Sequence, residues 1–194
     1  MALRNLAIVF IFIHFTASGQ RVVRKYFDPL KQQVEEEYTV SAQDGKTLDG
    51  PYKRYYPNGH TEVEGNFSNG YRSGVFREYN EEGVLVRKIS YLNGKRHGPV
   101  EVYDDNGIPI QRAFYQHNLL VDSVHSFFES GAVKSESYFA KGKPDGLVKE
   151  FYPTGTLRKE ITYKNKKPNG LTITYYEDGA KESEANFRDG VLTD

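Results

Sequence analysis

The sequence contains no cysteine and no tryptophan, and its Lys and Arg residues equal its Asp and Glu residues at 26 each. The absence of cysteine excludes disulfide bonds and thiolate metal sites. Balanced charge gives no long-range attraction to nucleic acid or to acidic membranes, so nucleic acid is not an expected partner and membrane contact is not indicated. The absence of tryptophan, whose ring has the widest face for sugar stacking, weakens a glycan-binding hypothesis.

Long hydrophobic runs are also missing, except at the start of the chain. Leu6 to Phe15 is apolar apart from His14, Arg4 precedes the run, and the small residues Ala17-Ser18-Gly19 follow it. This pattern predicts a secretory signal peptide over residues 1–19, cleaved before Gln20. The run is shorter than the about 20 residues of a membrane-spanning helix, although an uncleaved N-terminal anchor is the alternative. We therefore expect a periplasmic or secreted protein.

The main positive feature is a 24-residue unit that repeats six times in register over residues 50–194. The units begin at Gly50, Gly74, Gly98, Asp122, Gly146 and Gly170. Glycine occupies the tenth position of every unit: Gly59, Gly83, Gly107, Gly131, Gly155 and Gly179. An aromatic residue lies four positions earlier: Tyr55, Tyr79, Tyr103, Phe127, Phe151 and Tyr175. Units of this length cannot bury an apolar face alone, so they must stack into an array.

Each unit reads as a β-hairpin. Asn58-Gly59, Asn106-Gly107 and Asp178-Gly179 are strong hairpin-turn signals, because these residues tolerate the positive φ of a tight turn. A second turn, such as Ser68-Asn69-Gly70, closes the unit, and glycine at both turns argues against helices. The predicted fold is all-β: an elongated, single-layer, twisted antiparallel meander of six hairpins. Twelve strands at about 4.8 Å would span roughly 58 Å.

A two-residue first turn sets which residues share a face of the sheet. The expected cross-strand pairs are Tyr56 with Thr61, Arg54 with Val63 and Tyr52 with Gly65. One face then gathers a mostly apolar set, which in the fifth unit is Val148, Tyr152, Leu157, Ile161 and Tyr163. The other face carries the aromatic ladder from Tyr55 to Tyr175 among charged residues such as Glu64 and Lys88.

Several positions depart from the repeat. Asp122 replaces an opening glycine, and Asn118 and Lys166 replace glycine at the second turn. Pro109 removes a hydrogen-bond donor from its strand, so we expect the third hairpin to be bent or bulged. Residues 20–49 resemble a degenerate repeat that caps the array, as terminal units often do. A short helical turn within Leu30 to Tyr38 is the alternative for this segment.

No arrangement of side chains predicts catalysis. The sequence has no G-x-S-x-G nucleophile turn and no glycine loop opening onto a helix. His60, His97, His117 and His125 fall at four different positions of the unit, which indicates turn histidines rather than a metal ladder. The acidic turn Asp104-Asp105-Asn106-Gly107 suggests calcium but lacks the later bidentate glutamate, and turn-forming side chains account for it. We therefore expect no enzyme, no cofactor and no metal.

The aromatic ladder is the candidate binding site. It comprises Tyr55, Tyr79, Tyr103, Phe127, Phe151 and Tyr175, with Gly59, Gly83, Gly107, Gly131, Gly155 and Gly179 as structural turn glycines. Cross-strand aromatic pairs stabilise a sheet by about 0.2–1 kcal/mol each, so a purely structural role is the competing interpretation. The functional interpretation is a stacking surface for a peptide or a glycan, with a protein or a cell-envelope component as the expected partner.

The repeat resembles the shorter bacterial variant of the MORN repeat. The matching run, Y-Y-x-x-G-x-L followed by Y-x-N-G-K-x-x-G, is seen in Phe151-Tyr152-Pro153-Thr154-Gly155-Thr156-Leu157 to Tyr163, and in Gly83 to Tyr91 with Asn93-Gly94-Lys95 and Gly98. The resemblance extends from Gly50 to Thr193 and implies hairpins used for protein or lipid contact, not an enzyme. Together these features indicate an exported, non-catalytic interaction scaffold. The alternative, implied by the label of such bacterial proteins as YwqK-family antitoxins, is an immunity-like partner of one effector protein.

Overall fold

The computed structural model describes residues 20–140 and 142–193. Within these residues all regular structure is β-strand, and no helix is long and apolar enough to cross a membrane. The expected signal peptide lies outside the described residues. The strands are β1 (Arg21–Tyr26), β2 (Val34–Val40), β3 (Leu48–Tyr55), β4 (Thr61–Ser68), β5 (Tyr71–Tyr79), β6 (Leu85–Leu92), β7 (Lys95–Tyr103), β8 (Pro109–Gln116), β9 (Leu119–Phe127), β10 (Val133–Ala140), β11 (Lys143–Phe151), β12 (Leu157–Lys164), β13 (Lys167–Tyr175), β14 (Lys181–Arg188) and β15 (Val191–Leu192).

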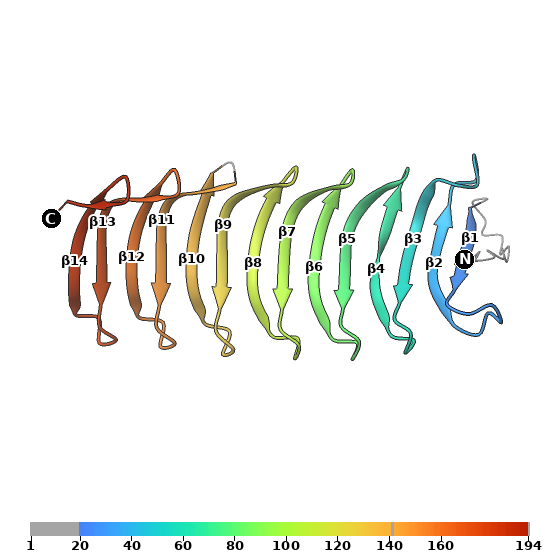
Figure 1. Cartoon of the computed structure of the whole chain (residues 1–194), viewed down its shortest axis with the longest axis horizontal. Helices are drawn as coiled ribbons and strands as arrows, with labels where there is room; N and C mark the ends of the chain where they lie inside the picture. The colour runs from blue at the N-terminus through green and yellow to red at the C-terminus, as the bar shows by residue number, and fades with distance from the viewer. Residues whose placement is uncertain (1–19, 141, 194) are drawn as a thin grey trace, which may run out of the picture. The chain divides into compact units, whose positions relative to one another are not determined.

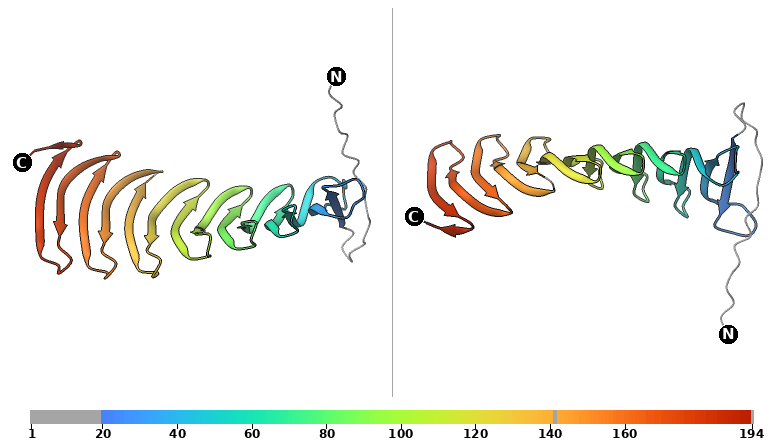
Figure 2. Two further views of the ribbon diagram at one scale, coloured as in Figure 1. Left: turned by 60° about the horizontal axis from the view of Figure 1, so that its bottom comes forward. Right: turned by 90° about the horizontal axis from the view of Figure 1, so that it is seen from above.

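The strands follow one another in sequence order, without a crossover, as an antiparallel meander. The chain divides into two compact units, residues 1–94 with β1 to β6 and residues 95–194 with β7 to β15. Figure 1 shows the strands of each unit side by side, joined by short turns at both ends. In the two views of Figure 2, the described part of each unit, taken by itself, is a single layer of strands. The predicted class, an antiparallel sheet of hairpins, is confirmed.

The first turn of each repeat has three residues rather than the expected two. In the first repeat, the amide of Tyr56 donates to the carbonyl of His60 at 2.8 Å, and that of Gly59 donates to Tyr56 at 2.9 Å. Gly59 has φ of 88°, as the last residue of such a turn requires. Consequently Tyr55, not Tyr56, pairs with Thr61. The predicted Tyr56–Thr61 pair is wrong.

A bulge in the second strand then cancels this shift. Glu62 has no partner in the β3–β4 register, so Arg54 pairs with Val63 and Tyr52 with Gly65, as expected. The same irregularity occurs beside the first turn of all six hairpins. One residue added in the turn and one in the strand leave the register beyond them unchanged.

The bulge moves one residue per hairpin to the other side of the sheet. Leu157, expected on the apolar face with Val148, instead pairs with Phe151 of the ladder, whereas Val148 pairs with Ile161. We call the side that carries Val148 and Ile161 the core face, and the side that carries the aromatic ladder the ladder face. The expected position of Leu157 on the apolar face is therefore wrong.

The core face holds every buried hydrophobic side chain among the described residues. These are Val23, Val40, Val63, Phe76 and Ile89 in the first unit and Val100, Ala113 and Ile161 in the second. Phe76 has no exposed surface and lies edge-on between the rings of Phe67, at 5.5 Å, and Tyr91, at 5.3 Å. In a single-layer sheet the side chains of one face are packed by their neighbours on the same face, and aromatic contacts of this kind stabilise it.

The second turns are the two-residue turns of the structure. Asn69 and Gly70 have φ of 48° and 82°, the left-handed pair that a type I′ hairpin turn requires. Asn165 and Lys166 adopt the same geometry with φ of 52° and 71°. Asn-Gly, the strongest sequence signal for a two-residue turn, therefore occurs in both turns of the first repeat. Only the second turn has two residues, whereas the first has three.

The N-terminal segment forms a hairpin of β1 and β2, so the helical alternative for Leu30 to Tyr38 is wrong. Its turn has no glycine; instead the carboxylate of Asp28 accepts hydrogen bonds from the amides of Gln32 and Gln33. The hydroxyl of Tyr52 donates to Glu36 at 2.8 Å and ties this hairpin to the first repeat. Burial and that hydrogen bond raise the pKa of Tyr52 to about 12.

Pro109 does not distort the third hairpin. It is the first residue of β8 and pairs with Tyr103 in the register that the other hairpins share. A proline is tolerated at the first residue of a strand, because the missing amide is not needed by the ladder there. The third hairpin has the same bulge as the other five, and Pro109 adds no further irregularity to it.

Gly155→Val is expected to destabilise the protein by about 1–2 kcal/mol or more. Gly155 has φ of 87°, which a β-branched residue adopts only with strain, and an added Cβ would meet nothing within 4 Å. The cost therefore comes from the backbone and not from a clash. Thermal unfolding should show a lower melting temperature for Gly155→Val than for Lys159→Ala. Equal melting temperatures would show that the turn does not need positive φ.

Asp122→Gly is expected to stabilise the protein by about 1 kcal/mol. Asp122 has φ of 64°, and the five glycines at its position in the other units also have positive φ. Glycine adopts this conformation without the strain that a Cβ adds. Urea denaturation would measure the gain, and Asp145→Gly, at a nearby exposed residue without positive φ, should be neutral or destabilising. A gain from both substitutions would refute the explanation from strain.

Candidate functional site

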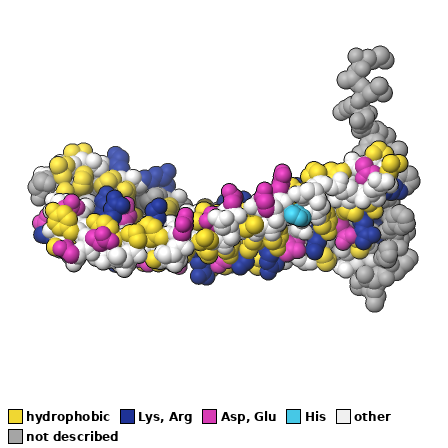
Figure 3. Space-filling view, turned by 90° about the horizontal axis from the view of Figure 1, so that it is seen from below, with side chains coloured by type: hydrophobic (Ala, Val, Ile, Leu, Met, Phe, Trp, Pro, Cys, Tyr) yellow, Lys and Arg dark blue, Asp and Glu magenta, His cyan; other side chains and the backbone are white. Residues whose placement is uncertain are grey.

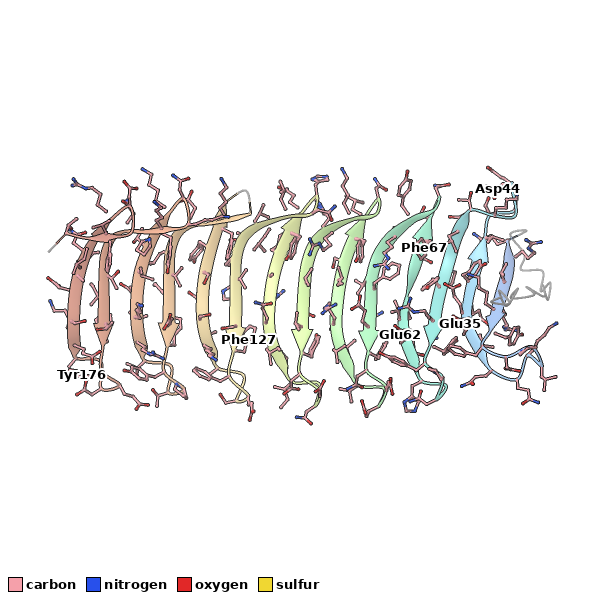
Figure 4. All side chains as sticks on the ribbon, in the orientation of Figure 1. Glu35, Asp44, Glu62, Phe67, Phe127 and Tyr176 are labelled. Carbon is pink, nitrogen blue, oxygen red and sulfur yellow. The ribbon has the colours of Figure 1, made fainter. Side chains whose placement is uncertain are left out.

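The aromatic ladder lies where six strands end. Each ladder residue is the last residue of its strand and pairs across the bulge with the first residue of the next strand. All six side chains are half-buried. In Figure 4, Phe127 lies at the first-turn end of its strand, whereas Phe67 of the core face lies nearer the second turn. The ladder rings are thus partly accessible and lie on the face opposite the buried hydrophobic side chains.

Glutamates on the same face hold two of the ladder hydroxyls. Tyr79 donates to Glu64, and Tyr103 donates to Glu101, each at 2.9 Å. Burial, followed by the hydrogen bond to Glu64, raises the pKa of Tyr79. The hydrogen bonds fix the orientation of both rings. Phe127 and Phe151 offer only their rings to a ligand.

Tyrosines one position beyond the ladder anchor its backbone. The hydroxyl of Tyr56 donates to the carbonyl of Tyr79 at 2.8 Å, and that of Tyr152 donates to the carbonyl of Tyr175 at 2.9 Å. Each bond links one hairpin to the ladder residue of the next. The sequence analysis did not assign this role, although the recurrence of an aromatic after the ladder residue was visible in Tyr55-Tyr56 and Phe151-Tyr152.

A row of ion pairs runs beside the ladder on the same face. Each pair joins the fourth and fifteenth residues of one hairpin. The Nζ–Oε distances are 3.5 Å for Lys53 with Glu64 and 3.7 Å for Lys149 with Glu160, and the Nε–Oε distances are 3.9 Å for Arg112 with Glu101 and 3.5 Å for His125 with Glu136. These pairs are partly exposed and contribute at most about 1 kcal/mol each to stability, and the His125–Glu136 pair is ionic only when His125 is protonated. They give the ladder face a regular polar margin.

The second unit contains a pocket of about 250 Å³ on this face. Its walls include the rings of two successive ladder residues, Tyr103 and Phe127, and Pro109 lines it between them. Glu101 and Arg112 lie on its polar side. The volume is below the roughly 300–1,000 Å³ of small-molecule sites and suits one side chain of a larger partner. Tyr103 and Phe127 thus line one pocket, which the sequence analysis did not foresee.

The histidines and acidic turns are arranged for structure. Asp104 accepts hydrogen bonds from the amides of Asn106 and Ile108 at 2.9 and 2.8 Å, as the turn-forming interpretation predicts. His97 and His117, which occupy different positions of the repeat, meet edge-on with ring centroids 5.0 Å apart. Over residues 20–140 and 142–193, no cluster of three or more His, Asp or Glu side chains is suited to hold a metal ion. Neither feature points to a reaction.

The surface at the first turns mixes the two signs of charge. Figure 3, which views the molecule from that end, shows acidic, basic and apolar side chains interspersed. Such a surface gives little long-range attraction and leaves recognition to short-range contacts. The ladder and its ion pairs offer both apolar and polar contacts of this kind.

Comparison with known protein families identifies five repeats. A family model described as MORN repeat variant matches residues 48–69, 72–93, 96–117, 144–165 and 168–189, more than half of the chain. The unmatched residues between the third and fourth matches contain β9, β10 and Asp122. They fold as a hairpin with the same bulge as the others. No curated protein matches this sequence.

Proposed function

Because the chain belongs to the MORN repeat variant family, we propose that it is a non-catalytic interaction protein that binds a partner through its ladder face. The observation that carries the proposal is the difference in burial between the two faces of the sheet. The buried hydrophobic side chains lie on the core face, whereas the six ladder aromatics are half-buried on the other. Partly exposed aromatics in a repeating row, beside polar side chains, are typical of interaction surfaces.

The proposed partner is a protein or another component of the cell envelope. Export is the basis for this location: the basic start, apolar run and small residues before Gln20 have the order of a secretory signal. The second candidate function, a YwqK-type antitoxin or immunity-like partner of one effector, follows from the family resemblance. It shares the same binding face and differs in how many partners the protein has.

Affinity capture with the full chain from its own envelope fraction tests the two functions. One partner recovered at equal stoichiometry supports the immunity-like function. Recovery of wall fragments or of several proteins at low occupancy supports the scaffold. Failure of every captured component to respond to substitutions in the ladder would refute both, because each requires this face.

The native protein is expected to begin at or near Gln20. Mass spectrometry of the intact protein from cells should give the mass of residues 20–194, reduced further if Gln20 has cyclised. The envelope or culture medium should contain this form, and the cytoplasm should not. Intact Met1 in a soluble cytoplasmic fraction would contradict export and favour a cytoplasmic antitoxin.

A further inference from the structure

The pocket between Tyr103 and Phe127 exists because the third repeat has proline where its neighbours have larger side chains. Pro109 pairs with Tyr103 and is exposed, whereas Val133 and Leu157, at the same position of the next two hairpins, are half-buried. The short, cyclic side chain of proline leaves space beside the ladder ring. Gly131 at the first turn of the next hairpin also lines the pocket, and an added Cβ would meet nothing within 4 Å there. The site is open to a side chain from outside.

The ladder of the second unit has a repeat distance that limits what can bind along it. Tyr103, Phe127, Phe151 and Tyr175 end alternate strands of one sheet. Alternate strands are about 9.6 Å apart, twice the strand spacing. A polyproline II helix has three residues per turn and rises about 3.1 Å per residue. Residues on one of its faces are therefore about 9.3 Å apart. Every third residue of such a helix meets the next ladder position.

Other backbone conformations do not share this period. In an extended strand the residues of one face lie about 6.8 Å apart, and then about 13.6 Å. An α-helix places residues i and i+7 on one face about 10.5 Å apart, which drifts from the ladder by nearly 1 Å per step. Polyproline II therefore fits the ladder over several steps, and its low conformational entropy favours binding to aromatic grooves.

Acidic side chains repeat with the same period beside the ladder. Three successive hairpins of the second unit carry a glutamate at the fifteenth position, on β10, β12 and β14, and we call these the glutamate row: Glu136, Glu160 and Glu184. Their side chains are between 26% and 53% exposed. The His125–Glu136 and Lys149–Glu160 contacts are long, at 3.5 and 3.7 Å, whereas Lys181 lies 2.8 Å from Glu184. A cation from a ligand can therefore approach Glu136 and Glu160 without displacing a short ion pair, whereas at Glu184 it competes with an exposed lysine.

We propose that the ladder face of the second unit binds a proline-rich segment in the polyproline II conformation, with a basic residue at every third position. The proposal rests on the proposed function and names the chemistry of its partner. The segment runs across the strands. One proline per turn packs against the ladder, with the deepest in the pocket over Pro109, and the basic residue that follows it lies along the glutamate row.

The probe is a dye-labelled peptide, (Pro-Arg-Pro)4, titrated with the full chain and followed by fluorescence anisotropy. We expect saturable binding that weakens as salt rises, because ion pairs with partly exposed carboxylates are screened. The peptide (Gly-Arg-Gly)4 has the same charge but no preformed polyproline II helix, and it should bind about tenfold more weakly or not at all. (Pro-Glu-Pro)4 should not bind. Equal affinity for the proline and glycine peptides would overturn the proposal.

The decisive variant is Pro109→Leu, which gives the third repeat the residue that the second and fifth already have, Leu85 and Leu157. It should fold with an unchanged or higher melting temperature and lose about tenfold in affinity for (Pro-Arg-Pro)4. Glu136→Gln should lose about threefold. The control Leu119→Ser, at an exposed residue of β9, should bind as wild type does. Wild-type affinity in Pro109→Leu would overturn the proposal.

The outcome separates this inference from the proposed function. If the ladder variants described below lose a captured partner while (Pro-Arg-Pro)4 fails to bind the wild-type chain, the ladder face is an interaction surface for a different chemistry. If (Pro-Arg-Pro)4 binds and Pro109→Leu weakens it, both proposals are supported. If neither the partner nor the peptide depends on the ladder, both are refuted.

Discussion

Gly65→Val is expected to destabilise the protein by about 3 kcal/mol, among the largest effects of a single substitution in this chain. A Cβ at residue 65 would lie 2.6 Å from Cγ of Phe76, closer than carbon atoms approach. Phe76 cannot move aside easily, because it has no exposed surface and contacts the rings of Phe67 and Tyr91. Urea denaturation should show the loss as a lower midpoint with an unchanged slope.

The cause of this loss can be isolated with a double-mutant cycle. Phe76→Ala alone should cost about 3–5 kcal/mol, because it leaves a cavity in the core face. Combined with Gly65→Val, it should cost at least about 1 kcal/mol less than the sum of the two, because each change relieves the other. Asn66→Val, at an exposed neighbour on the ladder face, is the control and should be nearly neutral. Additive losses would show that Gly65 is needed for another reason.

Replacing Tyr79, Tyr103 and Phe127 together by Ser is expected to abolish partner binding while costing only moderate stability. Aromatics near the centre of an interface each contribute about 2 kcal/mol or more to binding when truncated. All three side chains are half-buried and lie outside the buried core. The measurements are recovery of the captured partner and the urea midpoint of the variant. A folded variant that binds its partner as tightly as wild type would refute the ladder as a contact surface.

The matched control replaces Tyr91, Tyr115 and Phe139 by Ser on the core face. Tyr91 packs against Phe76, Arg72 donates to its hydroxyl at 3.0 Å, and the guanidinium of Arg96 lies 4.3 Å from the ring centroid of Tyr115. Loss of these rings should chiefly unfold the protein. If both triple variants unfold alike, the ladder is part of the stabilising core, and the functional surface must lie in the turns.

Much of the fold could be predicted because the sequence repeats its turn chemistry six times. A positive φ at the tenth position and a second turn near the end of each unit leave room for only two short strands between them. The register of Arg54 with Val63 and Tyr52 with Gly65 followed from alternation. It was predicted correctly for an incomplete reason, since a longer turn and a bulge at Glu62 offset each other. Periodicity alone does not reveal two opposite shifts of one residue.

The candidate site could be predicted less completely. The ladder residues were found because their spacing is constant, and the structure places them on one face away from the buried core. The pocket beside Pro109 and the tyrosines that hold the ladder backbone escaped notice. The proline was interpreted through its missing amide, whereas its small side chain is what matters here. The hydroxyls of Tyr56 and Tyr152 donate hydrogen bonds to the next hairpin. Contacts between repeats are not visible in the sequence of a single repeat.

The sequence by itself determined the hairpin array, because glycine and asparagine at fixed intervals restrict the backbone locally. The tertiary structure alone decided which side chains share a face and which meet across hairpins. Leu157 joined the ladder through a bulge, Phe76 filled the space above Gly65, and Pro109 left a hollow between two rings. The physical reason is range: turns are set by the φ preferences of a few residues, whereas packing depends on the volumes of side chains brought together from neighbouring strands.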